Sequence, residues 1–278
     1  MYKKQIDYTS LHTSKEEFLV VLDSRNATSY LNDSKNSSVM FQFEDSIQKD
    51  KNAIKLTCSV MAFTCPVSFY NINSTNNLLS LTIASITTNY YITPGNYNVD
   101  TFISALTALE PSFTITLNSI TNILSIRHST TNFTINSTST IYGVMGFKKS
   151  TSYTSSSLAL TMPYTVNFAG LNSFNIHFDN IVTRNIDSFT LSNSSIIASI
   201  PVNANQASII FFNKSFDFEF LVSQNIIDFI QIDLKDDIGN FIDLNNCHWN
   251  LTLQFTSYMD KPRKETTFLD ITGNNYNT

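Results

Sequence analysis

Residues 224–258 read QNIIDFIQIDLKDDIGNFIDLNNCHWNLTLQFTSY, and this stretch decides the fold. In its first arm, apolar side chains share one face that Asp228 interrupts: Ile226, Ile230, Ile232 and Leu234. The second arm alternates fully, with Cys247, Trp249, Leu251, Leu253 and Phe255 on one face and His248, Asn250, Thr252 and Gln254 on the other. Because strand side chains repeat every two residues, each arm is predicted to be a strand with one buried face.

The centre of this stretch, from Asp236 to Asn240, has the composition of a tight turn. Gly239 can adopt a positive φ, and Asp and Asn side chains can hydrogen-bond the backbone of a turn. The whole stretch is therefore predicted to form a β-hairpin with an elaborated turn. Trp249, the only tryptophan, lies in the middle of the second strand, and we expect it to be buried against the first arm as a core anchor.

An acidic group surrounds this turn, and it consists of Asp233, Asp236, Asp237, Asn240 and Asp243. These side chains resemble a calcium-binding loop only loosely, because the EF-hand spacing and its closing glutamate are missing. We interpret the group as turn chemistry and keep a weak cation site as the alternative.

Strand patterns recur along the rest of the chain. They predict strands at 18–23, 39–43, 54–62, 79–83, 113–117, 123–128, 133–135, 175–179, 195–200, 208–212 and 216–221. Pro66 is expected to end or bend the third of these strands and Pro201 to end another, because proline cannot donate a hydrogen bond to a sheet.

One helix is expected, with Asn98 as its N-cap and Pro111 at its end. Helical spacing is followed by Val99, Phe102, Ile103, Leu106 and Leu109. The face formed by Val99, Phe102, Ile103 and Leu106 should pack onto the short strands that follow the helix. Many strands and one helix predict an all-β protein, a β-sandwich with a small inserted α+β subdomain.

The expected boundaries follow from these patterns. Residues 1–16 form an N-terminal arm, 17–73 and 160–259 form the discontinuous sandwich, 74–150 form the insertion, and 260–278 form a C-terminal tail. The Ser/Thr-rich residues 148–157 are interpreted as a linker or a loop.

The composition favours a folded protein with a weakly charged surface. Of 278 residues, 42% are hydrophobic and 13% aromatic, but only 14% are charged, and the net charge is −5. Nucleic-acid binding as the main activity is unfavoured, because phosphate contacts need clustered basic residues. The short basic stretches, Lys3-Lys4 and Lys261 to Lys264, fall in the expected arm and tail. We interpret them as solvated ends and keep contact with an acidic partner or a genome as the alternative.

The three cysteines, Cys58, Cys65 and Cys247, do not suggest a disulfide framework. Cys58 and Cys65 are seven residues apart and would face opposite ways on a straight strand, so we expect core thiols in a reducing compartment. An apolar signal core and a membrane-length apolar window are both missing, which predicts a soluble protein made in a cytosol.

Catalytic patterns are weak in this sequence. The four histidines are His12, in the expected arm, and His128, His177 and His248, on expected strands. None has a partner at metal-ligand spacing, and no nucleophile elbow or phosphate-binding loop occurs. We therefore assign no catalytic, cofactor-binding or metal-binding residue, and expect no cofactor.

Three stretches in order resemble the penton-type minor capsid proteins of virophages and polinton-like double-stranded DNA viruses. The first runs from Tyr91-Ile-Thr-Pro-Gly-Asn-Tyr97 through the helix to Tyr142-Gly-Val-Met-Gly-Phe147. The second joins Asn180-Ile-Val-Thr-Arg-Asn185 to Ile197-Ala-Ser-Ile-Pro-Val202. The third pairs Ile230 to Asn240 with His248-Trp-Asn-Leu-Thr-Leu253, so the resemblance covers most of residues 17–258.

This resemblance implies a single jelly roll of eight strands in two sheets, with the insertion projecting from a capsid. It implies a homopentamer at the five-fold vertices of an icosahedral virion, assembled in the host cytoplasm and contacting the surrounding major capsid protein. The family carries no catalytic residues, so none are transferred to this chain. A host receptor or a glycan is a further expected partner, reached through the insertion.

Two alternatives compete with the capsid interpretation. The first is a β-sandwich receptor- or glycan-binding protein, such as a spike or a lectin-like module. An enzyme ranks third, because the constellations of catalytic residues are missing. A stable cyclic pentamer would favour the capsid function, and a monomer or trimer that binds glycans would favour the first alternative.

Overall fold

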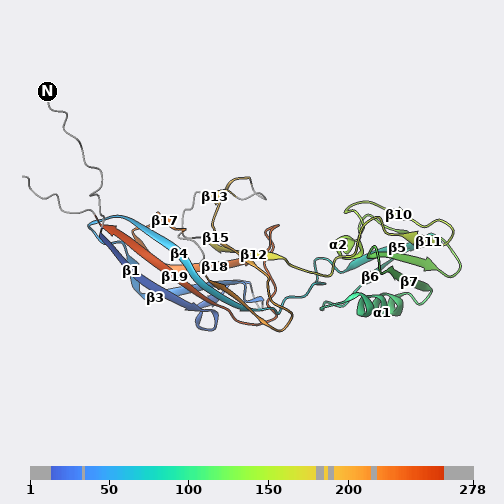
Figure 1. The fold of residues 1–278 in the computed structure, drawn as a ribbon, viewed down its shortest axis with the longest axis horizontal. Coiled ribbons are helices and arrows are strands. Elements are labelled where there is room, and N and C mark those ends of the chain that lie inside the picture. The colour runs from blue at the N-terminus through green and yellow to red at the C-terminus, as the bar shows by residue number, and fades with distance from the viewer. Residues whose placement is uncertain (1–13, 33–34, 180–184, 187–190, 214–217, 260–278) are drawn as a thin grey trace, which may run out of the picture.

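The computed structural model describes residues 14–32, 35–179, 185–186, 191–213 and 218–259. Figure 1 shows two lobes along the long axis of the molecule, a β-sandwich and a smaller lobe with strands and helices. Residues 1–13 of the expected arm and the whole expected tail, with His12, Lys3, Lys4 and Lys261 to Lys264, lie outside the described residues. In the described part, no helix is long and apolar enough to cross a membrane.

The sandwich consists of two antiparallel sheets. The first contains, in order, β1 (Ser14–Asp23), β19 (Asn250–Met259), β4 (Ala53–Pro66) and β16 (Ile209–Asn213), with β17 (Phe220–Val222) also paired to β4. The second contains β15 (Ile196–Pro201), β12 (Ser173–Phe178), β18 (Ile226–Lys235), β3 (Ser38–Gln48) and the short β2 (Ser29–Tyr30). Smaller elements are the 3₁₀ turn Ser24–Asn26 and the pair β13 (Asn185–Ile186) and β14 (Asn193–Ser194).

The strand order is that of a jelly roll. If β16 and β17 count as one interrupted strand and the short β2 is set aside, the sandwich has eight strands, four in each sheet. The first sheet takes the first, eighth, third and sixth strands, and the second sheet takes the fifth, fourth, seventh and second. This arrangement of two interlocked Greek keys confirms the predicted all-β jelly roll with an α+β insertion, which lies between β4 and β12.

The predicted hairpin across residues 224–258 is wrong. The strands β18 and β19 lie in opposite sheets, so the connection crosses the sandwich instead of returning along β18. The turn itself forms, but it pairs only Lys235 with Phe241, and the amide of Ile242 donates to the carbonyl of Leu234. Alternation defines which face of each strand is buried, but it does not define the neighbouring strand.

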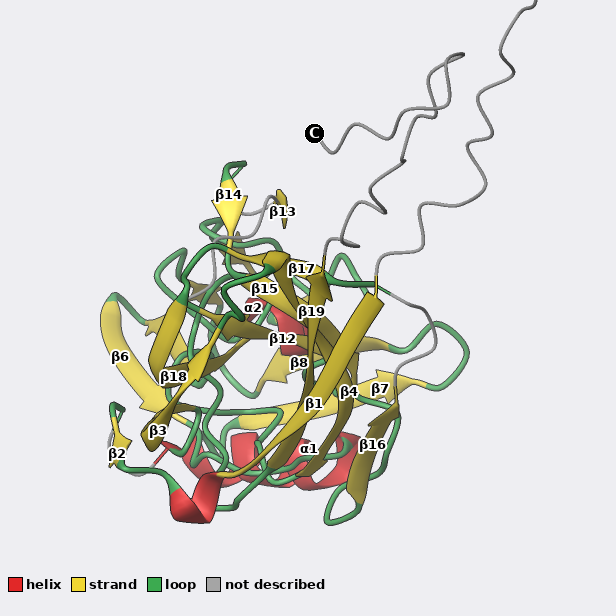
Figure 2. Ribbon diagram, turned by 90° about the vertical axis from the view of Figure 1, so that its left-hand side faces the viewer, coloured by secondary structure: helices red, strands yellow, loops and turns green. Residues whose placement is uncertain are grey.

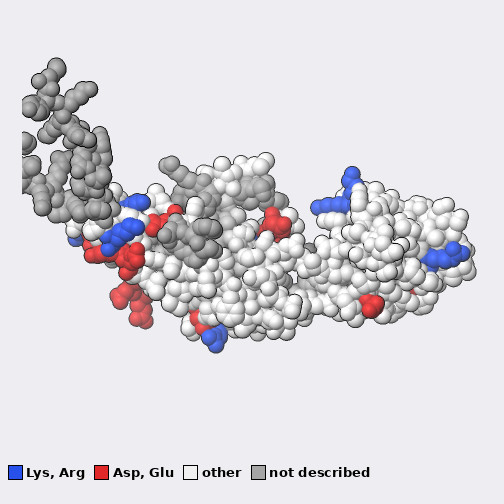
Figure 3. Space-filling model, viewed as in Figure 1, with Lys and Arg blue, Asp and Glu red and all other residues white. Residues whose placement is uncertain are grey.

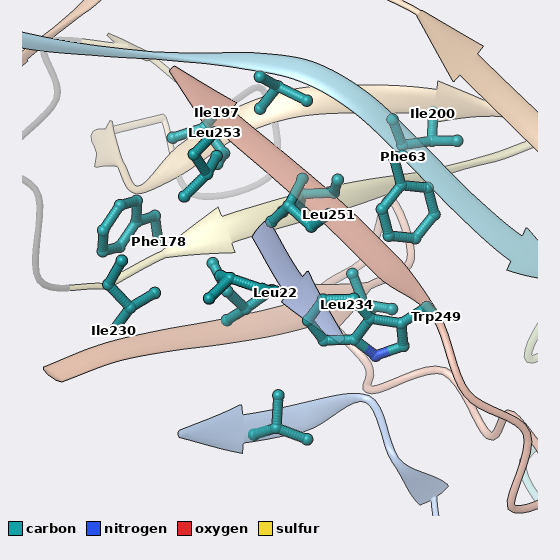
Figure 4. Close-up of a cluster of buried hydrophobic side chains, with 14 of the residues drawn as sticks. Leu22, Phe63, Phe178, Ile197, Ile200, Ile230, Leu234, Trp249, Leu251 and Leu253 are labelled. Carbon is teal, nitrogen blue, oxygen red and sulfur yellow. The ribbon is translucent and has the colours of Figure 1, made fainter. Parts of the chain in front are cut away.

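Trp249 is fully buried in the core of the sandwich, as expected. Its ring lies 6.0 Å from that of Phe63 and 6.2 Å from that of Phe41, and its indole N–H donates to the carbonyl of Asn36 at 2.9 Å. Figure 4 shows it among apolar side chains from both sheets, including Leu234 and Leu251. The strand β19 begins at Asn250, so Trp249 directly precedes the strand and does not lie in its middle.

Three strand predictions need correction. In β18, a bulge at Asp228 turns Ile227 into the core and leaves Ile226 exposed. In β4, Met61 is an extra residue opposite β19. Regular alternation from Val60 would turn Ala62 inward, but after the extra residue Phe63 points inward instead. A bulge shifts the alternation by one residue, and Cys58 and Cys65 therefore face the same core, contrary to expectation. The third concerns β1, which begins at Ser14, so the expected arm at 1–16 overlaps this strand.

The smaller lobe has its own apolar core. Two small sheets surround it: β10 (Tyr153–Thr154), β9 (Phe133–Ile135), β5 (Leu78–Ile83) and β6 (Ile86–Tyr91), and then β11 (Ala159–Thr161), β8 (Ile123–His128) and β7 (Phe113–Asn118). The helices are α1 (Val99–Leu109) and the short α2 (Tyr142–Met145).

The predicted helix is confirmed in position and in packing. The Asn98 side chain accepts from the amide of Thr101 at 2.9 Å, and the Thr101 hydroxyl accepts from the amide of Asn98 at 3.0 Å, which completes a capping box. Phe102 and Leu106 are buried in the core that the short strands form, so this apolar stripe is hidden within the lobe.

The lobe extends further along the chain than expected. The stretch 148–157 is not a linker, because Tyr153 and Thr154 pair with β9, and β11 then pairs with β8. The strand β6 was also missed, since the turn before it consists of Ala84 and Ser85, both at positive φ and both unusual in such turns. Because Ile72 and Met162 belong to this core, we propose that the insertion runs from about residue 70 to 168.

Candidate functional site

The acidic turn after β18 is stabilised by its own side chains. The Asp236 carboxylate accepts from the amides of Ile238 at 3.1 Å and Asn240 at 2.7 Å, and Asp243 accepts from the amide of Asn245 at 2.9 Å. These bonds confirm the interpretation as turn chemistry for Asp236, Asn240 and Asp243. No three His, Cys, Asp or Glu residues in the described part of the chain could hold a metal ion together.

Asp233 behaves differently from the rest of this group, because its side chain is buried. It accepts from the Ser38 hydroxyl at 2.6 Å and pairs with the Lys235 ammonium at 2.7 Å. Burial disfavours the charged carboxylate, but the hydrogen bonds from Lys235 and Ser38 outweigh it and hold the pKa of Asp233 below its ordinary value. The bond from Ser38 therefore joins the start of β3 to β18.

Replacing Asp233 by asparagine is expected to destabilise the protein by about 1–3 kcal/mol at neutral pH, because Lys235 loses its charged partner. Since the folded pKa lies below the unfolded value of about 3.9, the carboxylate stabilises the fold above about pH 4 and stops doing so as the pH falls through the folded pKa. The difference in unfolding free energy between wild type and variant, measured by urea unfolding, should therefore shrink as the pH falls below about 4.

Asp237→Asn on the exposed turn is the matched control, and it should change the unfolding free energy by less than about 0.5 kcal/mol. A difference between wild type and Asp233→Asn that stays constant from neutral to strongly acidic pH would contradict this account of the buried pair.

The described histidines hold loops and strand ends in place. The ring of His128 accepts from the amides of Thr130 and Thr131, and Nδ1 of His248 lies 3.2 Å from the Ser24 hydroxyl. His177 lies 3.1 Å from the Ser195 hydroxyl, which donates to Asp179 at 2.6 Å. These are triad residue types, but the hydroxyl donates to the carboxylate instead of the imidazole, so the imidazole is not placed as its base.

The thiols of Cys58 and Cys65 lie in the sandwich core as expected. Burial raises the pKa of Cys65 to about 12 and also raises that of Cys58. Both groups are therefore protonated at neutral pH, a state that suits packing and does not suit nucleophilic attack or metal binding.

The outer face of the first sheet carries exposed apolar side chains. Leu19 and Val21 on β1 are 61% and 69% exposed, and Phe211 on β16 is 66% exposed. Across the sheet, Val21 pairs with Thr252, and Thr252 pairs with Ala62, so this band holds no charged residue. Figure 3 shows few charged side chains on this face of the molecule; many lie at one end of the sandwich, and others are scattered over the rest, including the smaller lobe. Such a surface suits burial against another protein.

A groove of about 530 Å³ lies where the two lobes join. The side chain of Asn71 ties this junction together, since its amide donates to the carbonyls of Tyr97 at 2.8 Å and Phe168 at 3.0 Å. The side chains of Asn96 and Gln206 donate to each other at 2.7 and 3.0 Å, which links the smaller lobe to the sandwich. No sequence pattern indicates these contacts, because isolated Asn and Gln residues form no motif.

Comparisons with known proteins find a distant likeness among solved structures. No protein-family model matches the chain, and no curated protein matches it. The structure of selenomethionine-labelled mavirus penton protein is similar, with a TM-score of 0.48 and 11% identity over 88% of this chain and 99% of that one. The jelly roll rests on the strand order of this chain and not on that likeness.

The described structure separates the stretches that carry the sequence resemblance. The first stretch, from Tyr91 to Phe147, belongs to the smaller lobe and includes α1 and α2. The second includes β15, but residues 180–184 lie outside the described residues. The third provides one inner strand to each sheet, β18 and β19. The stretches that carry the resemblance therefore contribute residues to both hydrophobic cores.

Proposed function

We propose that this protein is a penton-type minor capsid protein, five copies of which close the five-fold vertices of an icosahedral capsid. One observation carries the proposal. The eight strands follow jelly-roll order, and the insertion lies at the end of the sandwich opposite to Ser14 and Met259, which pair with each other (Figure 1). Jelly rolls of this order recur in viral capsid proteins and in lectins.

This arrangement gives the molecule two different ends. The described ends of the chain lie together at one end, where an arm and a tail can reach the surrounding major capsid protein. The smaller lobe lies at the other end, where it would project from the virion. The sides of the sandwich, weakly charged and partly apolar, would face the neighbouring copies of a closed ring.

Reconstruction of purified particles tests this function. Density that fits the jelly roll, with the smaller lobe outermost, is expected at the five-fold vertices. The native mass of the complex released from the particles should be that of five chains. Particles that lack the protein, or that hold it away from the vertices, would overturn the proposal.

The junction groove favours a second candidate function, the binding of a neutral glycan. Its lining carries amides and aromatic rings, among them Asn98, Asn205, Tyr97 and Phe168, and no Asp, Glu, Lys or Arg. Amides exchange hydrogen bonds with sugar hydroxyls, and rings cover the apolar face of a sugar. A glycan array tests this function: binding that Tyr97→Ala abolishes would support it, and an array without any binding would exclude it for the glycans tested.

A further inference from the structure

The first sheet has two unpaired strand edges, one on each side. Among the described strands, β1 pairs only with β19, and β16 pairs only with β4 (Figure 2). A strand edge exposes a row of free N–H and C=O groups, and proteins normally cover it, twist it or interrupt it with charges. Neither edge is protected in this way, because residues 18–22 of β1 and 209–213 of β16 include no charged residue and no proline.

Apolar side chains beside both edges are left uncovered. On the solvent face of the sheet, four of them are more than half exposed: Leu19 and Val21 on β1, and Ile209 and Phe211 on β16. On the core face, Phe18 stacks on the buried Phe255 with the ring centroids 5.4 Å apart, but Phe18 itself remains 38% exposed. Phe212 on β16 packs against the same core and is only partly buried. Both edges therefore present apolar groups on both faces of the sheet.

We propose that β1 of one copy of this chain pairs with β16 of a second copy, so that the first sheets of neighbouring copies join edge to edge. The two edges of one copy lie three strand spacings apart, roughly 14 Å, and cannot pair with each other. One interface between copies covers both edges. The tail of the same chain, if it lay along β1, would leave the edge of β16 uncovered, so the second copy is the occupant that accounts for both.

Strand direction agrees with this pairing. β1, β19, β4 and β16 alternate in direction, so β16 runs opposite to β1. A rotation about an axis along the strands therefore brings β16 of one copy beside β1 of the next as an antiparallel pair. The interface is head-to-tail, and each copy gives one edge and receives another, as a closed ring requires.

The side chains select one register for this pair. Solvent-facing residues of one strand must lie opposite solvent-facing residues of the other, so the possible registers differ by steps of two residues. Only one of them places all four apolar residues 209–212 of β16 opposite apolar residues of β1. Its pairs include Val21 with Ile209, Leu19 with Phe211, Phe18 with Phe212, and Glu17 with Asn213.

This register covers the groups that each copy leaves exposed. Phe212 lies beside the exposed side of Phe18 and extends its stack with Phe255, because side chains on one face of adjacent strands pack together. The amide of Asn213 lies opposite Glu17, where it can donate to the carboxylate. The single charge at this edge therefore gains a polar partner and is not buried alone.

The same register suits a closed ring. Within one copy, Asn213 lies level with Val21, through Ala62 and Thr252. Pairing Asn213 with Glu17 of the next copy therefore shifts the register by four residues across four strands. One residue per strand is the stagger of an eight-stranded barrel, whose strands tilt by about 36° from the axis. Closure at five copies rests on the proposed function, whereas the edge pairing does not.

Oxidative cross-linking of the whole chain with Val21→Cys and Ile209→Cys together tests the pairing. Residues opposite each other on antiparallel strands have Cα atoms about 4.5–5.5 Å apart, within the reach of a disulfide. In one chain the two positions are too far apart to be bridged, so every bridge joins two copies. At about millimolar protein, comparable to the effective concentration in an assembly, we expect a ladder of products up to five chains, at least about tenfold above either single variant.

Val21→Cys with Asn213→Cys is the matched control. Both cysteines face solvent, but in the proposed register they lie four residues apart along the strands, about 13 Å, which is beyond the reach of a disulfide. No ladder from the first pair, or equal ladders from both pairs, would overturn the edge pairing.

A chain that ends at Met259 separates the second copy from the tail as the occupant of β1. Equal cross-linking of the shortened and the whole chain would support the second copy. A ladder that forms only after the tail is removed would show that the tail occupies β1, and would overturn the inference. A ladder that ends at a number other than five would uphold the edge pairing and contradict the proposed ring of five.

Discussion

Trp249→Ala is expected to lower the free energy of unfolding of the sandwich by about 3–5 kcal/mol, the range for truncating a large buried aromatic residue. The indole lies between the two sheets, with Phe41 and Phe63 at its sides, so its removal leaves a cavity that neither sheet can close. Its N–H bond to Asn36 is lost as well, which leaves a buried carbonyl without that donor. Urea unfolding followed by circular dichroism measures the effect.

Trp249→Phe is the matched variant for this experiment. It retains most of the ring contacts and loses the N–H donor, so it should cost about 1–3 kcal/mol and separate the hydrogen bond from the packing. If Trp249→Ala unfolds at the same urea concentration as the wild type, the indole does not anchor the core.

Phe102→Ala is expected to destabilise the smaller lobe by a similar amount, about 3–5 kcal/mol. Phe102 is fully buried in the second core, with its ring 5.2 Å from that of Phe168 and 6.3 Å from that of Tyr97. Because the two cores share no buried residue, the loss should stay within the lobe. Hydrogen exchange should accelerate in β5, β7 and β8, and remain unchanged in β4 and β19.

Ser104→Ala on the exposed side of α1 is the control for this variant, since it leaves the core of the lobe intact. Equal acceleration of exchange in the sandwich and in the lobe would show that the two cores unfold as one unit. That result would contradict the division of the chain into a sandwich and an insertion.

Local periodicity predicted most of the strands but not their partners. The alternation around Trp249 correctly identified the buried face of β19, because this face depends only on residues two apart. The assignment of β18 and β19 to one hairpin failed, because the partner of each strand comes from far along the chain: Ser14 to Asp23 for β19, and Ser38 to Gln48 for β18. Sequence resemblance, and not the pattern, implied the jelly-roll order.

The bulges and the buried polar groups were equally beyond local patterns. An extra residue such as Met61 reverses which side chains of a strand point inward, and the type of residue does not predict the bulge. Asp233 alternates with apolar residues, a pattern that predicts an exposed carboxylate, yet Lys235 and Ser38 allow it to be buried. The acidic turn was predicted correctly, because Asp236 bonds residues only two and four positions away.

The contacts of Asn71 have a consequence for how such a chain can diversify. Asn71 holds the points where the chain leaves and rejoins the sandwich within hydrogen-bonding distance, through the carbonyl of Phe168. For the sandwich, the whole insertion is equivalent to a loop whose two ends are held together by this hydrogen bond. Lengthening such a loop costs little additional entropy. One lobe can therefore be exchanged for another of different size and specificity while the eight strands keep their order. The inner architecture would be inherited, and the outward surface would be free to vary.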